Sequence, residues 1–183
     1  TEAEATANTC QDLGADTLLI QADVSQDEAC RTMVAAPMNQ WGRIDALVNN
    51  AGMTRYCDYA NLEGLQADDF HRIYAVNVIG AFQMTRAVVP HMKAAGEGAI
   101  VNTSSISAKT GIGSSMAYAA SKGAMNTLTL SLAQTLGPEI RVNAVCPGFI
   151  QGRWIRNGIG VEKYEALKSC LLYTSDAADE WLR

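Results

Sequence analysis

The sequence has little of what marks membrane, secreted or nucleic-acid-binding proteins. No apolar run approaches the roughly 20 residues that a membrane-spanning helix needs. Residues 1–10 are polar and acidic and have neither the basic nor the apolar part of a signal peptide, and no initiator Met precedes them. The formal net charge is −5, and no block of Lys or Arg offers a surface for nucleic acid. We therefore expect a cytoplasmic protein with neither a membrane nor a nucleic-acid partner.

Cysteine is also sparse, and its pattern argues against a metal site. The five cysteines are scattered, with no C-x-x-C pair and no nearby pair of histidines. We interpret them as reduced packing residues of a cytoplasmic protein that holds no metal. The 183 residues, 48% hydrophobic and 18% charged, suffice for one globular domain with a sizeable core.

What the sequence does contain is a regular alternation of apolar runs and amphipathic segments. This alternation is typical of β-α-β units and a parallel sheet. We expect two breaks in the helices, an interruption or end near Pro37 and a separation at Gly80. The expected strands are 17–21, 44–48, 99–103 and 140–145. The expected helices are 2–13, 27–41, 67–77, 80–95 and 118–136, and 49–64 and 104–116 are expected to be loops.

Three polar or Gly-containing segments follow predicted strands. They are residues 49–52 (Asn-Asn-Ala-Gly), 104–105 (Ser-Ser) and 147–148 (Pro-Gly). An open parallel sheet binds ligands beyond the carboxyl ends of its strands. We therefore expect these segments to share the ligand-binding edge.

The residues best suited to proton transfer are Tyr118 and Lys122. Four residues apart, they lie on one face of a helix that opens after a Ser/Gly-rich loop. An isolated pair of this kind usually means only a Tyr packed beside a surface Lys. A phenol has a pKa of about 10, and a nearby ammonium makes it a usable acid or base at neutral pH by stabilising the phenolate.

The polar residues around this pair are ambiguous on the sequence alone. Ser104, Ser105 and Ser107 are equal candidates for a supporting hydroxyl, or all three merely solvate a turn. Asn77, in a helical stretch, is by itself best explained as a local partner of the backbone.

A family resemblance gives these residues roles. Asp23-Val24, residues 49–52, Asn77, Ser105, Tyr118-x-x-x-Lys122 and Pro147-Gly148 occur in the order and spacing of the classical short-chain dehydrogenase/reductase family. The resemblance covers about residues 1–156. It implies an α/β fold, a Rossmann-like doubly wound parallel sheet in an incomplete three-layer α/β/α arrangement. Residues 1–169 would form this partial domain.

The resemblance implies an oxidoreductase that uses NAD or NADP on a small carbonyl or alcohol substrate. Tyr118 would be the general acid or base, and Lys122 would lower its pKa and bind the nicotinamide ribose. Ser105 would bond the substrate oxygen, and Asn77 would hold a water that links Lys122 to solvent. The implied cofactor-binding residues are Asp23, Val24, Asn49, Ala51, Gly52, Tyr118, Lys122, Pro147, Gly148 and Ile150, and no metal is implied. For Asn49 a structural role, tying loop to sheet, is a parallel interpretation.

The sequence does not distinguish a 3-oxoacyl reductase-like substrate from that of a sugar or alcohol dehydrogenase. A catalytically silent binding or regulatory protein on the same fold is the alternative, and a structural interaction protein is a third possibility. Helices 80–95 and 118–136 resemble those that form four-helix dimer interfaces in the family, which implies a homodimer or homotetramer.

The sequence departs from the family pattern at both ends. No Gly-rich pyrophosphate-binding turn precedes Thr1, so of the family's strand order 3-2-1-4-5-6-7 we expect only strands 3 to 6. Gly152 stands where many members carry Thr, and Arg153-Trp154 where a substrate lid begins. Residues 170–183 resemble a translated sequencing adapter and are expected to be a non-native tail. We expect the 183-residue chain alone to expose the apolar edge of strand 44–48, to be poorly stable and to bind dinucleotide weakly.

Overall fold

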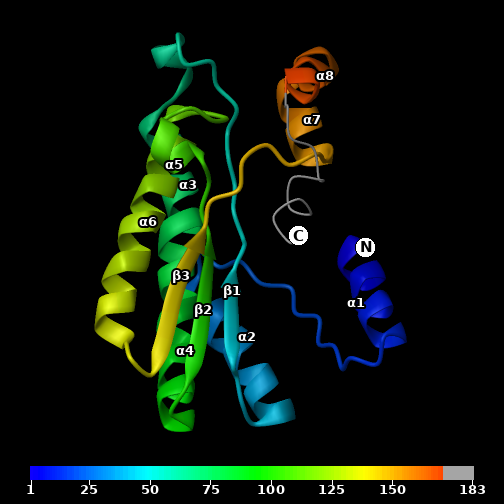
Figure 1. The fold of residues 1–183 in the computed structure, drawn as a ribbon, viewed down its shortest axis with the longest axis vertical. Helices are drawn as coiled ribbons and strands as arrows, with labels where there is room; N and C mark the ends of the chain where they lie inside the picture. Colours follow the sequence, from blue (N-terminus) through cyan, green and yellow to red (C-terminus); the bar gives the residue numbers. More distant parts are fainter. Residues whose placement is uncertain (171–183) are drawn as a thin grey trace, which may run out of the picture.

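The computed structural model describes residues 1–170, which fold around a parallel sheet. Its three strands are β1 (Ala46–Asn49), β2 (Gly98–Thr103) and β3 (Ile140–Val145), in the order β1-β2-β3 (Figure 1). Both pairings are parallel, with Leu47 beside Ile100 and Ile100 beside Val142. These are the strands predicted over 44–48, 99–103 and 140–145, and all three carboxyl ends lie at one edge.

The helices occupy most of the rest of the described chain. They are α1 (Glu2–Asp12), α2 (Asp27–Trp41), the 3-10 turn η1 (Leu62–Gly64), α3 (Ala67–Tyr74), the π-helix η2 (Ala75–Gly80), α4 (Ala81–Ala95), α5 (Ser107–Thr110), α6 (Met116–Leu136), α7 (Arg153–Ile159) and α8 (Val161–Cys170). Helices α4 and α6 pack on the sheet, and α2 packs on α4. The region between residues 1 and 170 contains no helix long and apolar enough to cross a membrane.

The core lies between the sheet and these helices. Ile100 and Val142 point from the sheet toward Val88 and Met92 of α4, and Val34 of α2 closes the cluster. All five side chains are at most 6% exposed. Burial of such side chains contributes roughly 1.5–3 kcal/mol each, which fixes α2 and α4 against the sheet.

The opposite face of the sheet is largely open in residues 1–170. Val48 and Val145 point to that face and are 62% and 48% exposed. In Figure 1, α1, α7 and α8 stand apart from this face. The predicted fold class is confirmed, and the described residues supply the sheet with one of its two helical layers.

The prediction of a strand over 17–21 is wrong. Residues 15–23 have no regular secondary structure, and Leu19 is 52% exposed. An apolar extended segment becomes a strand only when its backbone pairs with a neighbour, and no described strand lies beside it. The sheet therefore contains the family's strands 4, 5 and 6.

Two predicted helix breaks are also wrong. Helix α2 runs through Pro37 to Trp41 without interruption, because its inner face is held against α4. The chain also stays helical through Gly80, whose backbone is in the right-handed helical region. A Cβ at Gly80 would lie 2.7 Å from Val24 Cγ2, so this glycine serves close packing.

The predicted loop over 104–116 contains the short helix α5, and α6 begins at Met116, two residues before the predicted start. The predicted non-native tail, 170–183, lies outside the described residues apart from Cys170 at the end of α8.

Candidate active site

Three chain segments meet where the strands end. The loop after β2 is bound to the end of β3, since Ser104 N donates to Val145 O at 2.8 Å and Ile106 N donates to Pro147 O at 2.9 Å. These bonds hold residues 104–106 beside 145–147. The predicted ligand edge is therefore a continuous structure.

Tyr118 and Lys122 lie at the start of α6. Ser115 caps this helix by accepting a 3.3 Å bond from Tyr118 N. Lys122 Nζ lies 5.6 Å from the centre of the Tyr118 ring and donates to Thr103 O at 2.7 Å. Lys122 is 4% exposed, so β2 and α6 enclose its ammonium almost completely.

Burial governs the titration of both groups. It raises the pKa of the Tyr118 phenol, and a hydrogen bond with Ser105 opposes that rise. Burial also lowers the pKa of Lys122. The resemblance implied that Lys122 lowers the phenol pKa. In this structure burial has the largest influence on the phenol pKa and gives a net rise, and the implied effect of Lys122 stays a prediction.

Of the three candidate serines, only Ser105 acts on the phenol. Ser104 Oγ donates to Lys122 O at 3.1 Å and so fastens the loop to α6. Ser105 Oγ accepts from Ser107 N and donates to Ser107 Oγ, both at 3.1 Å. Ser107 therefore orients Ser105, and Ser105 interacts with Tyr118.

Asn77 lies on the π-helix η2 and is fully buried. Its Oδ1 accepts from Met53 N at 2.8 Å, and its Nδ2 donates to Met53 O at 3.0 Å and to Ser121 Oγ at 2.9 Å. Ser121 in turn donates to Tyr118 O at 2.7 Å. Both amide protons of Asn77 are used, so its side chain joins the loop after β1 to α6.

The loop after β1 passes close to this network. Ala51 and Gly52 are exposed, and a Cβ at Gly52 would lie 3.5 Å from Asn77 Oδ1 and 3.8 Å from Lys122 Nζ. Within residues 1–170 the Lys122 ammonium makes one hydrogen bond out of three possible donations. A ligand with hydroxyl groups, such as a ribose, fits this arrangement of a bare backbone beside a buried ammonium.

Asn49 takes the structural role. Its Nδ2 donates to Asn102 Oδ1 at 2.9 Å, and Asn102 Nδ2 donates to Thr129 Oγ1 at 2.9 Å. Asn49 Nδ2 also contacts Ala81 O and Thr85 Oγ1 on α4 at 3.4 Å. This buried amide network joins β1 and β2 to both packed helices, while the Asn49 backbone leads directly into the exposed turn at 51–52.

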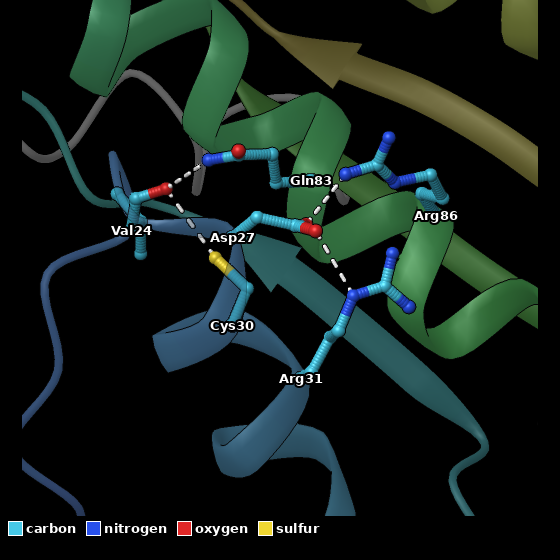
Figure 2. Close-up of polar contacts among 6 residues, drawn as sticks. All are labelled: Val24, Asp27, Cys30, Arg31, Gln83 and Arg86. Carbon is cyan, nitrogen blue, oxygen red and sulfur yellow. Dashed lines mark hydrogen bonds and ion pairs between the residues drawn. The ribbon is translucent and has the colours of Figure 1, made fainter.

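Asp23 and Val24 lie on the far side of α4 from α6. The Asp23 carboxylate accepts a 2.9 Å bond from Ser25 N, which lowers the pKa of Asp23. Figure 2 shows Val24 O accepting from Gln83 Nε2 at 2.8 Å and from Cys30 Sγ at 3.3 Å. The segment is thus bound to α2 and α4 even though it forms no strand.

An ion-pair network supports this attachment. Asp27 accepts from Arg86 Nη2 at 2.6 Å and from Arg31 Nε at 2.9 Å (Figure 2). Both hydrogen bonds lower the pKa of Asp27, and the bond from Arg86 has the larger effect. The network joins the first turn of α2 to α4 next to Val24.

The segment after β3 leads from the site to α7. Pro147 is half-buried, whereas Gly148 is exposed and Ile150 is 61% exposed. Trp154 of α7 then returns to the site, its ring centre 6.3 Å from that of Tyr118 in an edge-to-face arrangement.

Ser121 and Tyr56 were not among the site residues predicted from the sequence. The signal for Ser121 was its place beside Lys122, on the helix face that carries Tyr118. Tyr56 gave no signal, because its contact with α7 joins segments about 100 residues apart. In the described part of the chain no three or more His, Cys, Asp or Glu side chains gather as metal ligands.

A parallel sheet with helices packed on it and polar residues at its carboxyl edge defines a Rossmann-like α/β protein. The family model for short chain dehydrogenase matches residues 1–157. The chain therefore belongs to the short chain dehydrogenase family.

Relatives within this family are oxidoreductases. The chain is 43% identical over 150 residues to 2-(R)-hydroxypropyl-CoM dehydrogenase of Xanthobacter autotrophicus, covering 81% of this chain and 60% of that protein. It is 40% identical over 130 residues to 3-oxoacyl-acyl-carrier-protein reductase of Thermotoga maritima, covering 70% and 52%. The structure of NAD+-bound xylitol dehydrogenase matches with a TM-score of 0.77 and 34% identity, covering 83% and 58%. The chain thus spans between half and two thirds of these relatives.

Proposed function

We propose that the protein is an NAD- or NADP-dependent oxidoreductase that interconverts a carbonyl compound and an alcohol. The observation that carries this proposal is the packing of Tyr118, Lys122 and Ser105 at the carboxyl edge of the sheet. Family membership and the oxidoreductase relatives support the class of reaction.

The residues would hold a nicotinamide dinucleotide along the sheet edge. Lys122 and the backbone of residues 51–52 would contact the nicotinamide and adenosine riboses, Asp23 and Val24 the adenine, and Pro147, Gly148 and Ile150 the nicotinamide. When bound, the cofactor supplies the hydride in reduction and accepts it in oxidation.

Tyr118 then moves the proton. Once its proton turns away from Ser107 Oγ, Ser105 Oγ would donate a hydrogen bond to the substrate carbonyl oxygen and stabilise the negative charge that develops there. In reduction the Tyr118 phenol gives its proton to that oxygen, and the raised phenol pKa keeps the proton in place beforehand. In oxidation the same oxygen atom of Tyr118 takes the proton back from the alcohol.

Lys122 and Asn77 support this transfer. The Lys122 ammonium stabilises the phenolate that remains after proton donation. Asn77, with both amide protons bonded, positions Tyr118 through Ser121. A water at Asn77 would have to donate to the remaining lone pair of Oδ1, and we propose that the proton relay uses this acceptor.

The test is a nicotinamide absorbance assay on the full-length protein with a panel of ketones and alcohols and with NAD and NADP. We expect turnover with at least one carbonyl/alcohol pair. Cofactor binding without any turnover across the panel would contradict the proposal and favour a silent binding protein. A variant, Ser107→Ala, keeps the Ser105 hydroxyl and removes the Ser107 hydroxyl that helps to orient it. We expect it to be less active than the wild type but not inactive.

A further inference from the structure

The side chains nearest to the Tyr118 ring on the α7 side are aromatic. Trp154 meets Tyr118 edge to face at 6.3 Å, a favoured geometry for two aromatic rings. Trp154 is nevertheless 55% exposed. The exposed indole is therefore free to contact a molecule that binds beside the Tyr118 ring.

Tyr56 holds the backbone of Trp154 in place. Its hydroxyl donates to Trp154 O at 3.4 Å, across about 100 residues of sequence. A Cβ at Gly158, one turn further along α7, would lie 2.0 Å from the Tyr56 ring, so only glycine leaves room for this ring. The Tyr56 ring therefore lies directly against α7, and burial, followed by the proximity of Tyr118, raises the pKa of the Tyr56 phenol.

The segment that carries Tyr56 is attached to the start of the catalytic helix. Cys57 N donates to Ser114 O at 2.9 Å, and the hydroxyls of Thr54 and Ser114 lie 2.6 Å apart. Ser114 directly precedes the N-cap of α6. Tyr56, Trp154 and Tyr118 are thus held in one unit by three different parts of the chain.

The charged neighbours of the two rings are engaged elsewhere. Arg55 forms an ion pair with Asp69, which also accepts from Gln66 N at 2.9 Å at the start of α3. Arg153 pairs with Glu2 on α1, both side chains being highly exposed. The first pair is built into a helix cap, and the second is a surface pair of the kind that contributes little. The rings, rather than a fixed cation, therefore define this side of the site.

We propose that Trp154 and Tyr56 form an aromatic wall beside Tyr118 that selects substrates with an uncharged, flat ring next to the reacting carbon. This inference rests on the proposed function, since it names the substrate class of that same site. Trp154 supplies the contact surface, and Tyr56 is a positioning residue that acts through the Trp154 backbone.

The experiment compares three ketones with the full-length protein: acetophenone, butan-2-one and 4-acetylbenzoate. Four variants are used, Trp154→Ala, Trp154→Phe, Tyr56→Phe and, as the matched control on the same helix, Arg153→Ala. We expect acetophenone to have the highest kcat/KM. Trp154→Ala should lower that value about tenfold or more while changing butan-2-one by less than about threefold. Trp154→Phe should restore most of the loss.

Tyr56→Phe keeps the ring and removes the hydroxyl bond to Trp154 O. We expect it to raise the KM for acetophenone with little change in kcat, and Arg153→Ala to change neither. If Trp154→Ala lowered kcat/KM equally for acetophenone and butan-2-one, the proposed wall would be overturned. A higher kcat/KM for 4-acetylbenzoate than for acetophenone that disappears in Arg153→Ala would also overturn the wall, because it would show that the site recognises an anion.

A binding measurement separates this inference from the proposed function. Binding of the alcohol 1-phenylethanol should change the indole emission of the wild type, and Trp154→Phe should remove that change. Absence of turnover with every ketone would contradict the proposed function, and an emission change lost on substitution would still support the wall. Absence of an emission change in the wild type would overturn the wall even if ketones are turned over.

Discussion

At the scale of single residues, the site depends on a buried cation. Lys122 is 4% exposed, and its one hydrogen bond within residues 1–170 is to a neutral carbonyl. Burial of an ammonium without an anionic partner costs free energy and lowers its pKa. In the proposed mechanism this buried cation stabilises the phenolate that develops on Tyr118.

The cost of this burial should depend on pH. Below the lowered pKa, Lys122 is charged in both the folded and unfolded states, and folding bears the full cost. Between that pKa and the ordinary value near 10.5, only the unfolded state remains protonated, so stability rises with pH. A pKa lowered by one unit corresponds to about 1.4 kcal/mol.

We therefore expect the free energy of unfolding of the wild type, minus that of Lys122→Met, to increase as the pH rises toward 10.5. Urea unfolding at several pH values measures this difference. The substitution keeps the buried stem, so the two proteins share the titrations of groups distant from residue 122. A difference that stays flat or falls with pH would contradict the burial cost.

The sequence predicted the positions of the candidate site residues better than their physical state. The four-residue spacing of Tyr118 and Lys122 predicts a shared helix face, which the structure confirms. The spacing could not distinguish Ser105 from Ser104 and Ser107, since that depends on how the loop turns after β2. Nor could it give the direction of the phenol pKa, because desolvation depends on residues brought in from β2, α7 and the loop after β1.

At the scale of elements, Gly80 shows how one position joins residues 23–24, the proposed adenine contact, to the helix layer. A methyl group there would meet Val24 Cγ2 at 2.7 Å and Val24 O at 3.0 Å. Val is stiff at χ1, and its carbonyl is fixed by Gln83 and Cys30, so neither atom can move freely.

Gly80→Ala should therefore destabilise the protein by about 1 kcal/mol, since overpacking costs roughly 1–3 kcal/mol and the gain in helix propensity is only about 0.5–1. Gly123→Ala is the matched control, because a Cβ there meets nothing within 4 Å inside α6, and it should be neutral or stabilising. Urea unfolding of both variants provides the measurement. Equal free energies of unfolding for Gly80→Ala and Gly123→Ala would show that Val24 does not pack closely against Gly80.

The elements that the sequence predicted well are those with strong local signals. Asp27–Trp41 and Ile140–Val145 have the predicted bounds, because apolar periodicity and flanking Gly or Pro define them. Residues 17–21 have the same apolar, β-favouring character as a strand. They fail to form one because a strand also needs a neighbour, which local sequence cannot supply.

At the scale of the whole molecule, a parallel sheet gathers the site from distant parts of the chain. Residues 49–52, 104–105 and 147–148 lie about 50 residues apart in sequence, and the parallel pairing of β1, β2 and β3 brings them to one edge. The α2–α4 network around Asp27 adds residues 23–24 to the same assembly (Figure 2). The proposed cofactor contacts and the proton donor thus depend on one sheet.

The central claim is that Tyr118 transfers the proton in a nicotinamide-dependent reaction. The most direct test compares single-turnover hydride transfer in the wild type and in Tyr118→Phe, with cofactor binding measured separately by nicotinamide fluorescence. We predict that Tyr118→Phe lowers the rate about 10²- to 10⁴-fold and leaves cofactor affinity within about threefold. A variant that transfers hydride at nearly the wild-type rate would contradict the account.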